Sequence, residues 1–475
     1  MKSGIRKIPA IVVATVLLAG CKTFSPDGGI STVAELAAPD SGKEIVRLRT
    51  EEDAVYAREA VTRLLKRPLT AESAVQLALY NNRGLQAAYN ELGISEAVLV
   101  GAYLPPNPTF SVERLSSSVE VEIGGRAIAN ILALLTLPAR AGVAEDRYRQ
   151  AQLRAAEETL RVAANTRRAF YRAVAARESA AFLGEAKTAA ETATKLARRL
   201  GETGAMNKLD QAREQVFYAE VAAQLAAQQQ RSTSERERLI RMLGLWGKDA
   251  EFALPKSLPP LPAGFRALPT VEIDAVRRRL DLQAARLEVE ALAKSYGLTN
   301  ATRFLNLLEV TGIAEKKKEK ATGEIERTRG GEIEFQIPLF DFGQVGVRRA
   351  EEEYLRAVNR LTEKAVNVRS EARDAYRTFR TSYDLARHYR NEVLPLRKII
   401  SEETLLRYNA MQIDVFALLA EARQRVTTTI AAIDAHRDFW LASTDLMGAV
   451  VGGGADGMAN GPAPMAAAEA SGGGH

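Results

Sequence analysis

The stretch LTAESAVQLALYNNRGLQAAYNELGISEAVLVGAY, residues 69–103, has a second copy further along the chain. Its four letters LQAA, residues 85–88, return at residues 282–285 within PTVEIDAVRRRLDLQAARLEVEALAKSYG. A threonine, Thr70 or Thr270, precedes the helical pattern in each copy, and this residue type favours helix starts. We predict one helix over residues 69–103 and a matching helix in the second copy.

The segments that follow the two copies are also alike. Short alternating runs separated by polar turns make up LPPNPTFSVERLSSSVEVEIGG, residues 104–125, and FLNLLEVTGIAEKKKEKATGEIERTRGGEIEFQIPLF, residues 304–340. This pattern predicts a pair of strands in each copy. The assignment stays open for AIANILALLTLP, residues 127–138, which fits a helix as well as a strand.

A very long helical segment comes next in each copy, over residues 140–200 and 344–407. About 60 residues at 1.5 Å per residue reach about 90 Å, which is longer than an ordinary globular core. We therefore expect these helices to be sheathed by one another as coiled coil. Pro395 is expected to kink the second one.

Both long helices break at similar phrases, GETGAMNKLDQAREQ at 201–215 and RYNAMQIDVFALLAEAR at 407–423. In each phrase the letters AM precede a residue suited to cap the return helix, Asn207 or Asp414. Asp210, at the third helical position, suits the positive end of the helix dipole.

The order of helix, strand pair, long helix, turn and return helix therefore occurs twice. The predicted organisation is a first repeat over 69–253, a Pro-rich connector over 254–268, a second repeat over 269–452 and a disordered, low-complexity tail over 453–475.

The N-terminus predicts export. Residues 1–20 have the basic start and short apolar run of a secretory signal peptide. The run ends in LAGC, which resembles a bacterial lipobox and implies a lipid such as palmitate on Cys21, the single cysteine, at the start of a lipidated segment over 21–68. The alternatives are a signal peptide with an incidental Cys, or a short anchor helix. Lys22 after the Cys favours the outer membrane, by resemblance to other lipoproteins.

Composition argues against other classes of protein. The 65 Lys and Arg residues and 59 Asp and Glu residues are interspersed, without the basic and aromatic clustering of a nucleic-acid binder. The HRD letters in AHRDFW, residues 435–440, lack an Asn at kinase spacing, and the histidines are far apart. We expect no enzyme, no catalytic residue, no metal site, and no cofactor besides the lipid.

Four strands per chain cannot close around a useful pore. A sheet that spans a membrane must close, because open edges leave backbone groups unsatisfied in lipid. Several protomers would therefore share one barrel. The predicted fold class is mainly α, with long coiled-coil helices and a membrane β-barrel portion.

The chain resembles the TolC-like outer membrane factor family over roughly residues 69–450. The resemblance is carried by the LTAESAVQLALYNN opening, by YLPPNPTFSVE, by RYNAMQIDVFALLAEAR, and above all by the strand-to-helix junction IPLFDFGQVGVRRAEEEY, residues 337–354. With the lipobox, the chain looks like a lipidated branch of that family.

This resemblance implies a homotrimer with twelve strands in one β-barrel and twelve helices in a periplasmic α-barrel. It implies an exit duct of the outer membrane that passively conducts exported solutes, served by a periplasmic adaptor and an inner-membrane pump. The alternative is a periplasmic helical adaptor or structural lipoprotein without a pore, although the β-module that usually flanks an adaptor's helices is not evident.

The resemblance also directs attention to particular residues. Pro338, Phe340 and Gly343 form the junction, where Gly343 would permit the sharp passage from strand to helix. Family members carry gating acids in the second return helix, where this chain has Ala417 and Ala420. The nearest candidates are Asp210 and Asp414, which are either helix-cap acids or a carboxylate ring at the periplasmic mouth that favours cations. The two roles are compatible.

Two further patterns concern the strand region. We expect KKKEK, residues 316–320, to be a solvated extracellular loop tip; the alternative is a site for a polyanion such as lipopolysaccharide. Phe335, Phe340 and Phe342 are either an aromatic belt near the membrane boundary or packing residues.

Overall fold

The computed structural model describes residues 23–264 and 270–454. Cys21, the predicted signal peptide and most of the predicted tail lie outside these residues. The chain divides into two compact units, and each takes segments from both sequence repeats. Of the described residues, the strand unit contains 23–33, 88–155 and 281–366. The helical unit contains 34–87, 156–264, 270–280 and 367–454. In the described part of the chain, no helix has the length and apolar character that a membrane span requires.

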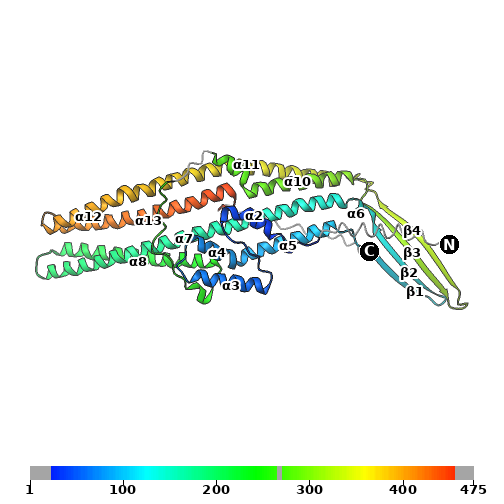
Figure 1. The fold of residues 1–475 in the computed structure, drawn as a ribbon, viewed down its shortest axis with the longest axis horizontal. Coiled ribbons are helices and arrows are strands. Elements are labelled where there is room, and N and C mark those ends of the chain that lie inside the picture. The colour runs from blue at the N-terminus through cyan, green and yellow to red at the C-terminus, as the bar shows by residue number, and fades with distance from the viewer. Residues whose placement is uncertain (1–22, 265–269, 455–475) are drawn as a thin grey trace. The chain divides into compact units, whose positions relative to one another are not determined.

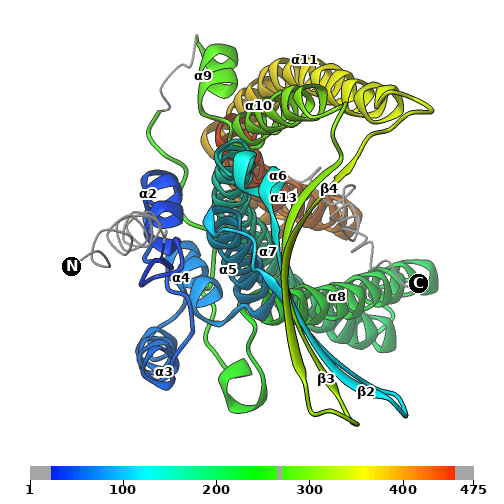
Figure 2. The ribbon, with the colours of Figure 1, turned by 90° about the vertical axis from the view of Figure 1, so that its right-hand side faces the viewer.

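The strand unit contains one antiparallel sheet, whose strands bend along their length (Figures 1 and 2). Its strands, hydrogen-bonded in sequence order, are β1 (Thr109–Ser116), β2 (Glu120–Asn130), β3 (Leu307–Glu319) and β4 (Ile325–Gln336). β2 pairs with β3 and so joins the two halves of the sequence, with Gly124 opposite Glu315. The predicted strand pair in each half is confirmed.

Helices lead into and out of this sheet. They are α5 (Arg83–Tyr103) before β1, α6 (Ile131–Leu135) and α7 (Leu137–Glu202) after β2, α10 (Leu280–Ala301) before β3 and α11 (Gln344–His388) after β4. Within the strand unit, the Gln150 amide donates to Glu288 at 3.1 Å, and Tyr296 stacks on Tyr354 with ring centroids 6.5 Å apart. These contacts join α10 to α7 and to α11.

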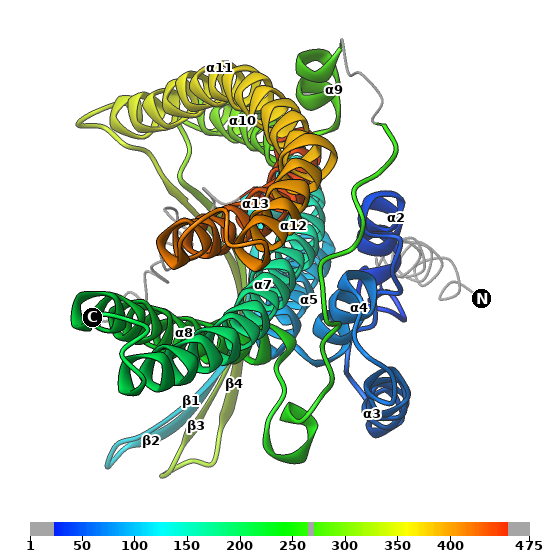
Figure 3. The ribbon, with the colours of Figure 1, turned by 90° about the vertical axis from the view of Figure 1, so that its left-hand side faces the viewer.

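The helical unit contains parts of α5, α7 and α11 and most other helices (Figures 1 and 3). These others are α2 (Ile30–Ser41, which begins in the strand unit), α3 (Glu51–Leu65), α4 (Ala71–Asn81), α8 (Lys208–Leu243), the 3₁₀ turn η1 (Gly247–Ala250), α9 (Val271–Arg278), α12 (Leu394–Asn409) and α13 (Val415–Val451). Thr70 begins α4 as predicted, because its Oγ1 accepts the Ser73 N–H at 3.1 Å. From the sequence alone, no helix is predicted at the positions of α2 and α3.

Two helical hairpins, α7 with α8 and α12 with α13, lie side by side in the helical unit (Figure 3). Buried side chains from both hairpins form a shared cluster, made of Ala190, Phe217, Val221 and Leu419. A second cluster joins Leu183, Leu225 and Val426. The two hairpins thus bury apolar side chains of α7, α8 and α13 against one another. Mutual sheathing of the two predicted long helices, 140–200 and 344–407, stays a prediction.

The prediction of one helix over residues 69–103 is wrong, because the chain breaks at Asn82 between α4 and α5. Asn82 has an extended ψ of 110°, and its Oδ1 accepts the Leu85 N–H at 3.1 Å. Its Nδ2 donates to the Met242 carbonyl at 3.0 Å. The side chain thus satisfies backbone groups in place of the helix. The second copy breaks in the same way at Arg279, between α9 and α10.

The interruption expected near Pro395 is confirmed. A π-helical turn, η2 (Tyr389–Val393), separates α11 from α12. Pro395 lies in the first turn of α12, where the N–H that proline lacks is least needed.

The prediction that KKKEK is a loop tip is wrong. The first four residues belong to β3, where Lys316 lies between Ile123 of β2 and Arg327 of β4, and the turn follows at residues 320–324. A strand exposed on both faces accepts a run of lysines because alternate side chains point to opposite faces. The ambiguous stretch 127–138 is strand as far as Asn130, whose Oδ1 accepts the Ala133 N–H at 2.8 Å and starts α6.

Candidate functional site

The sheet has two chemically different faces. Side chains alternate along a strand, and residues paired across strands point to the same face, so the register assigns each residue to a face. Every acidic residue of the four strands lies on one face, here named the acidic face: Glu113, Glu120, Glu122, Glu309, Glu315, Glu319, Glu326, Glu332 and Glu334. Among basic residues of the strands, this face carries only Arg126 and Lys317.

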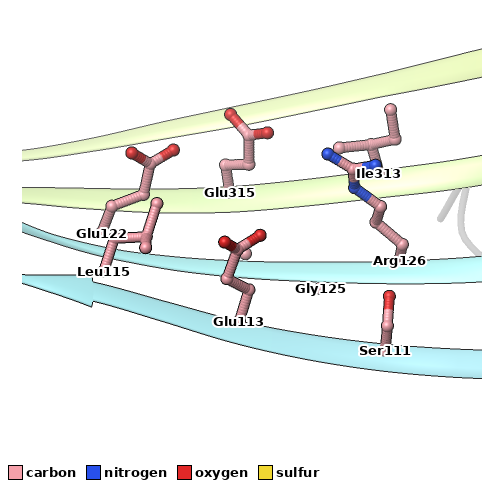
Figure 4. Close-up of a pocket in the computed structure, with 9 residues that line it drawn as sticks. Ser111, Glu113, Leu115, Glu122, Gly125, Arg126, Ile313 and Glu315 are labelled. Atoms are coloured by element: carbon pink, nitrogen blue, oxygen red, sulfur yellow. The ribbon is translucent and has the colours of Figure 1, made fainter. Parts of the chain in front are cut away.

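The acidic face is hollowed. A cavity of about 170 Å³ lies over β1, β2 and β3, and Figure 4 shows Glu113, Glu122 and Glu315 pointing to the same side of the sheet. Lys317 Nζ lies 3.6 Å from Glu122 Oε1, so part of the charge is paired. The sheet therefore presents a polar, negatively charged and concave wall.

The opposite face, here named the apolar face, carries large apolar side chains that are exposed to solvent. Phe110 is 73% exposed and Val112 is 81% exposed, and Ile333 and Phe335 are also exposed. Contiguous exposed apolar surface of this kind marks a protein or membrane contact. An apolar outer side and a polar inner side form the pattern of a strand in a membrane barrel.

The junction between β4 and α11 turns through two residues in the left-handed region, Phe342 (φ 50°) and Gly343 (φ 73°). A Cβ at Gly343 would lie 2.2 Å from the Arg303 carbonyl oxygen, so only glycine fits. Asp341 Oδ1 accepts the Gly343 N–H at 3.1 Å. Phe340, two residues after Pro338, is fully exposed, so it does not pack against the described residues.

Asp210 and Asp414 both lie at the hairpin turns, but only Asp414 is a helix cap. Asp414 is the N-cap of α13, and its Oδ1 accepts the Ala417 N–H at 2.9 Å. Asn207 is the N-cap of α8; its Oδ1 accepts the Asp210 N–H at 2.9 Å, and its Nδ2 donates to Asp210 Oδ2 at 2.8 Å. The two predicted N-caps are confirmed. The gating role of these acids stays a prediction.

An arginine that the sequence reading did not single out links the two turns. The Arg213 guanidinium lies 3.9 Å from Asp210 Oδ1 and 4.6 Å from the ring centroid of Phe416 in the other hairpin. Arg423 likewise lies 3.5 Å from Glu220 Oε2 and 5.3 Å from the ring centroid of Phe217. These cation–π and ionic contacts hold α8 against α13 close to the turns.

Two further acids occupy corresponding positions, each seven residues after its N-cap. Glu421 pairs with Arg397 of α12 at 3.0 Å. Glu214 is only 2% exposed, and its Oε2 has no hydrogen-bond partner among the described residues. Burial raises the pKa of the Glu214 carboxyl, and the charge of Arg423 opposes this shift. The equal spacing from Asn207 and Asp414 was the signal that could have found this pair.

Within the described residues, no group of three or more His, Cys, Asp or Glu side chains is placed to hold a metal ion.

Comparisons with known proteins agree with this geometry. Residues 274–401 match the family model described as outer membrane efflux protein. A membrane protein from Pseudomonas aeruginosa has a similar structure, with a TM-score of 0.68 and 18% identity over 82% of this chain and 93% of that one. CusC is similar with a TM-score of 0.66 and 16% identity, over 80% of this chain and 92% of that one. The Campylobacter jejuni CmeC outer membrane channel is similar with a TM-score of 0.59 and 17% identity, over 84% of this chain and 86% of that one. No curated protein matches by sequence.

At these identities the structural likeness establishes the fold. The expected mainly α fold with an internal repeat is confirmed, and the strands form one small antiparallel sheet. The membrane β-barrel portion of the expected class stays a prediction.

Proposed function

Because residues 274–401 belong to the outer membrane efflux protein family, we propose that this chain is the outer-membrane channel of a tripartite efflux system. The observation that supports the proposal best is the two-faced sheet. Its concave side carries the charge suited to a water-filled lumen, and its other side carries the apolar surface suited to lipid. Such a channel conducts exported solutes passively and performs no chemistry.

The working unit in this proposal is a homotrimer, since four strands cannot close a barrel. The helical unit supports assembly, because α12 buries no residue within the chain. It exposes apolar side chains at helical spacing, namely Leu396, Ile399, Ile400 and Leu406. An open groove of about 550 Å³ runs between α12 and α13 beside them. Helices from neighbouring copies would cover this surface.

The proposed setting follows from the family and from the N-terminus. Signal cleavage would leave a lipid on Cys21 in the outer membrane, and the helical hairpins would extend into the periplasm. There an adaptor would connect the turns to an inner-membrane pump. Asp210 and Asp414 would form a carboxylate ring at that mouth, in addition to the local contacts that they make at the helix starts.

Planar-bilayer conductance of the purified protein, with its mass measured in the same detergent, tests the proposal. We expect a trimer with discrete openings. A monomer without conductance would instead favour the pore-less adaptor or structural lipoprotein. Asp210→Ala with Asp414→Ala should loosen the closed state or lower cation selectivity. Unchanged gating and selectivity would reject a gate role for these two residues.

A further inference from the structure

The basic residues on the apolar face are gathered at one end of the strands. Arg114, Lys316, Lys318, Arg327 and Arg329 all lie toward the two hairpin turns and are here named the basic band. The large apolar residues Phe110, Val310 and Phe335 lie further toward the helices. This face of the described strands carries no acidic residue, so five cations border an apolar surface without local counter-charge.

The cations of the basic band are also close to one another. Arg114, Lys316 and Arg327 belong to one row across the sheet, in which Lys316 and Arg327 are direct cross-strand partners. Like charges in directly opposed positions destabilise a sheet. None of the five makes an ion pair or a side-chain hydrogen bond with the described residues. An anionic partner from outside the chain would remove this repulsion.

We propose that the basic band binds the phosphate-bearing headgroups of anionic lipids in the leaflet that surrounds the turn end of the sheet. The proposal rests on the membrane role proposed above. The apolar residues would contact acyl chains, and the cations, one to three rows nearer the turns than Phe110, would then lie at headgroup level. Each Lys or Arg beside an anionic lipid surface strengthens binding about fivefold. The opposite sign of the acidic face keeps this attraction on the outward side of the sheet.

The sequence offers a matched pair of variants. Lys316→Gln with Arg327→Gln removes one lysine and one arginine from the basic band. Lys317→Gln with Arg126→Gln removes the same charges from the acidic face. Lys316 and Lys317 are neighbours in the chain but lie on opposite faces, so the two pairs compare the same loss of charge on the two faces of the sheet.

The probes are phosphatidylcholine nanodiscs that contain the full-length protein, with diphosphoryl lipid A or its dephosphorylated form at equal mole fraction. Lipid retained by the protein is counted by native mass spectrometry across a titration. We expect the wild type and the Lys317/Arg126 variant to prefer the diphosphoryl lipid. The Lys316/Arg327 variant should bind it about 25-fold more weakly, since two contributions of about fivefold multiply.

Three results would overturn the inference: no preference for the phosphorylated lipid, equal weakening by both variants, or displacement of the lipid by millimolar inorganic phosphate, which would indicate a free-anion site. Planar-bilayer conductance of the same protein preparations separates this inference from the proposed function. A wild type that conducts but shows no lipid preference defeats the inference alone. A wild type that fails to insert and conduct defeats the proposed function as well.

Discussion

The two halves of the chain reverse direction in the same way, yet they leave the sheet in different ways. At the hairpin turns, Gly204 (φ 76°) and Met411 (φ 57°) take the same left-handed position, three residues before Asn207 and Asp414. In each turn the following N–H returns to a carbonyl five residues earlier, at 2.8 and 2.9 Å. The letters AM, which suggested the correspondence, do not occupy equivalent positions. The shared geometry lies in the backbone.

The exits from the sheet show the contrast. β4 reaches α11 through the tight turn at Gly343, which presses against the Arg303 carbonyl. β2 reaches α7 through the short helix α6. A Cβ added at Gly142, in the second turn of α7, would meet no atom of the described residues within 4 Å. A repeated architecture thus fixes the order of elements and leaves each connection to its local sequence.

Replacing Gly343 by Ala should have the largest effect. A Cβ would meet a backbone oxygen at 2.2 Å in a left-handed residue, so we expect a loss of about 3 kcal/mol of stability or failure to assemble. Gly142→Ala should be neutral or stabilising by up to about 1 kcal/mol, because its site is helical and open. Thermal unfolding of both variants measures the difference. Equal losses would show that the two exits are alike after all.

Replacing Arg397 by Gln should have the next largest effect. It leaves the Glu421 carboxylate half-buried without its partner, which we expect to lower stability by about 2 kcal/mol. Lys398→Gln is the matched control, because its pair with Glu402 is exposed at 3.8 Å and contributes little. Unfolding at neutral pH measures both. If the two variants lose the same stability, the Arg397–Glu421 pair has no special role.

Glu214→Gln should stabilise the protein, by on the order of 1 kcal/mol at neutral pH. With its pKa raised by burial, the folded state holds the Glu214 proton to higher pH than the unfolded chain does. Stability therefore falls as pH rises from the ordinary value of 4.5 through the raised one. The Gln variant removes this loss. The free energy of unfolding of both proteins, measured at a series of pH values, checks this. A difference between wild type and variant that stays constant above pH 4.5 would contradict the prediction.

The smallest effect concerns the turns themselves. Met411→Gly should stabilise the protein by less than about 1 kcal/mol, because it relieves a left-handed methionine. Gly204→Ala should lower stability by about 1 kcal/mol for the converse reason. Opposite shifts in unfolding temperature would confirm that the two turns are equivalent, and shifts of the same sign would break the comparison.

Much of the architecture could be predicted because its signals are local. The strand pairs follow from alternation, and the return helices follow from the N-caps Asn207 and Asp414. The break at Asn82 was missed because its reason, a hydrogen bond to Met242, lies 160 residues away along the chain. The lysine run was misplaced because a polar strand and a polar loop look alike where no residue is buried, as at the turn end of β3.

The candidate site divides in the same way. The capping roles of Asn207 and Asp414 were readable, because a cap depends on its nearest neighbours. The difference between Glu421, which pairs with Arg397, and Glu214, whose Oε2 has no partner among the described residues, could not be predicted. It depends on which residue of the preceding helix lies opposite each acid.

The sequence by itself determined the doubled order of elements and the alternation of charge along each strand, since both depend on periodicity and on hydrogen bonds within a few residues. Only the tertiary structure decided that the acids of all four strands gather on one concave face. That outcome requires the register between β2 and β3, which are far apart in the chain, and the direction in which the sheet bends. Both are set by long-range pairing that no local segment contains.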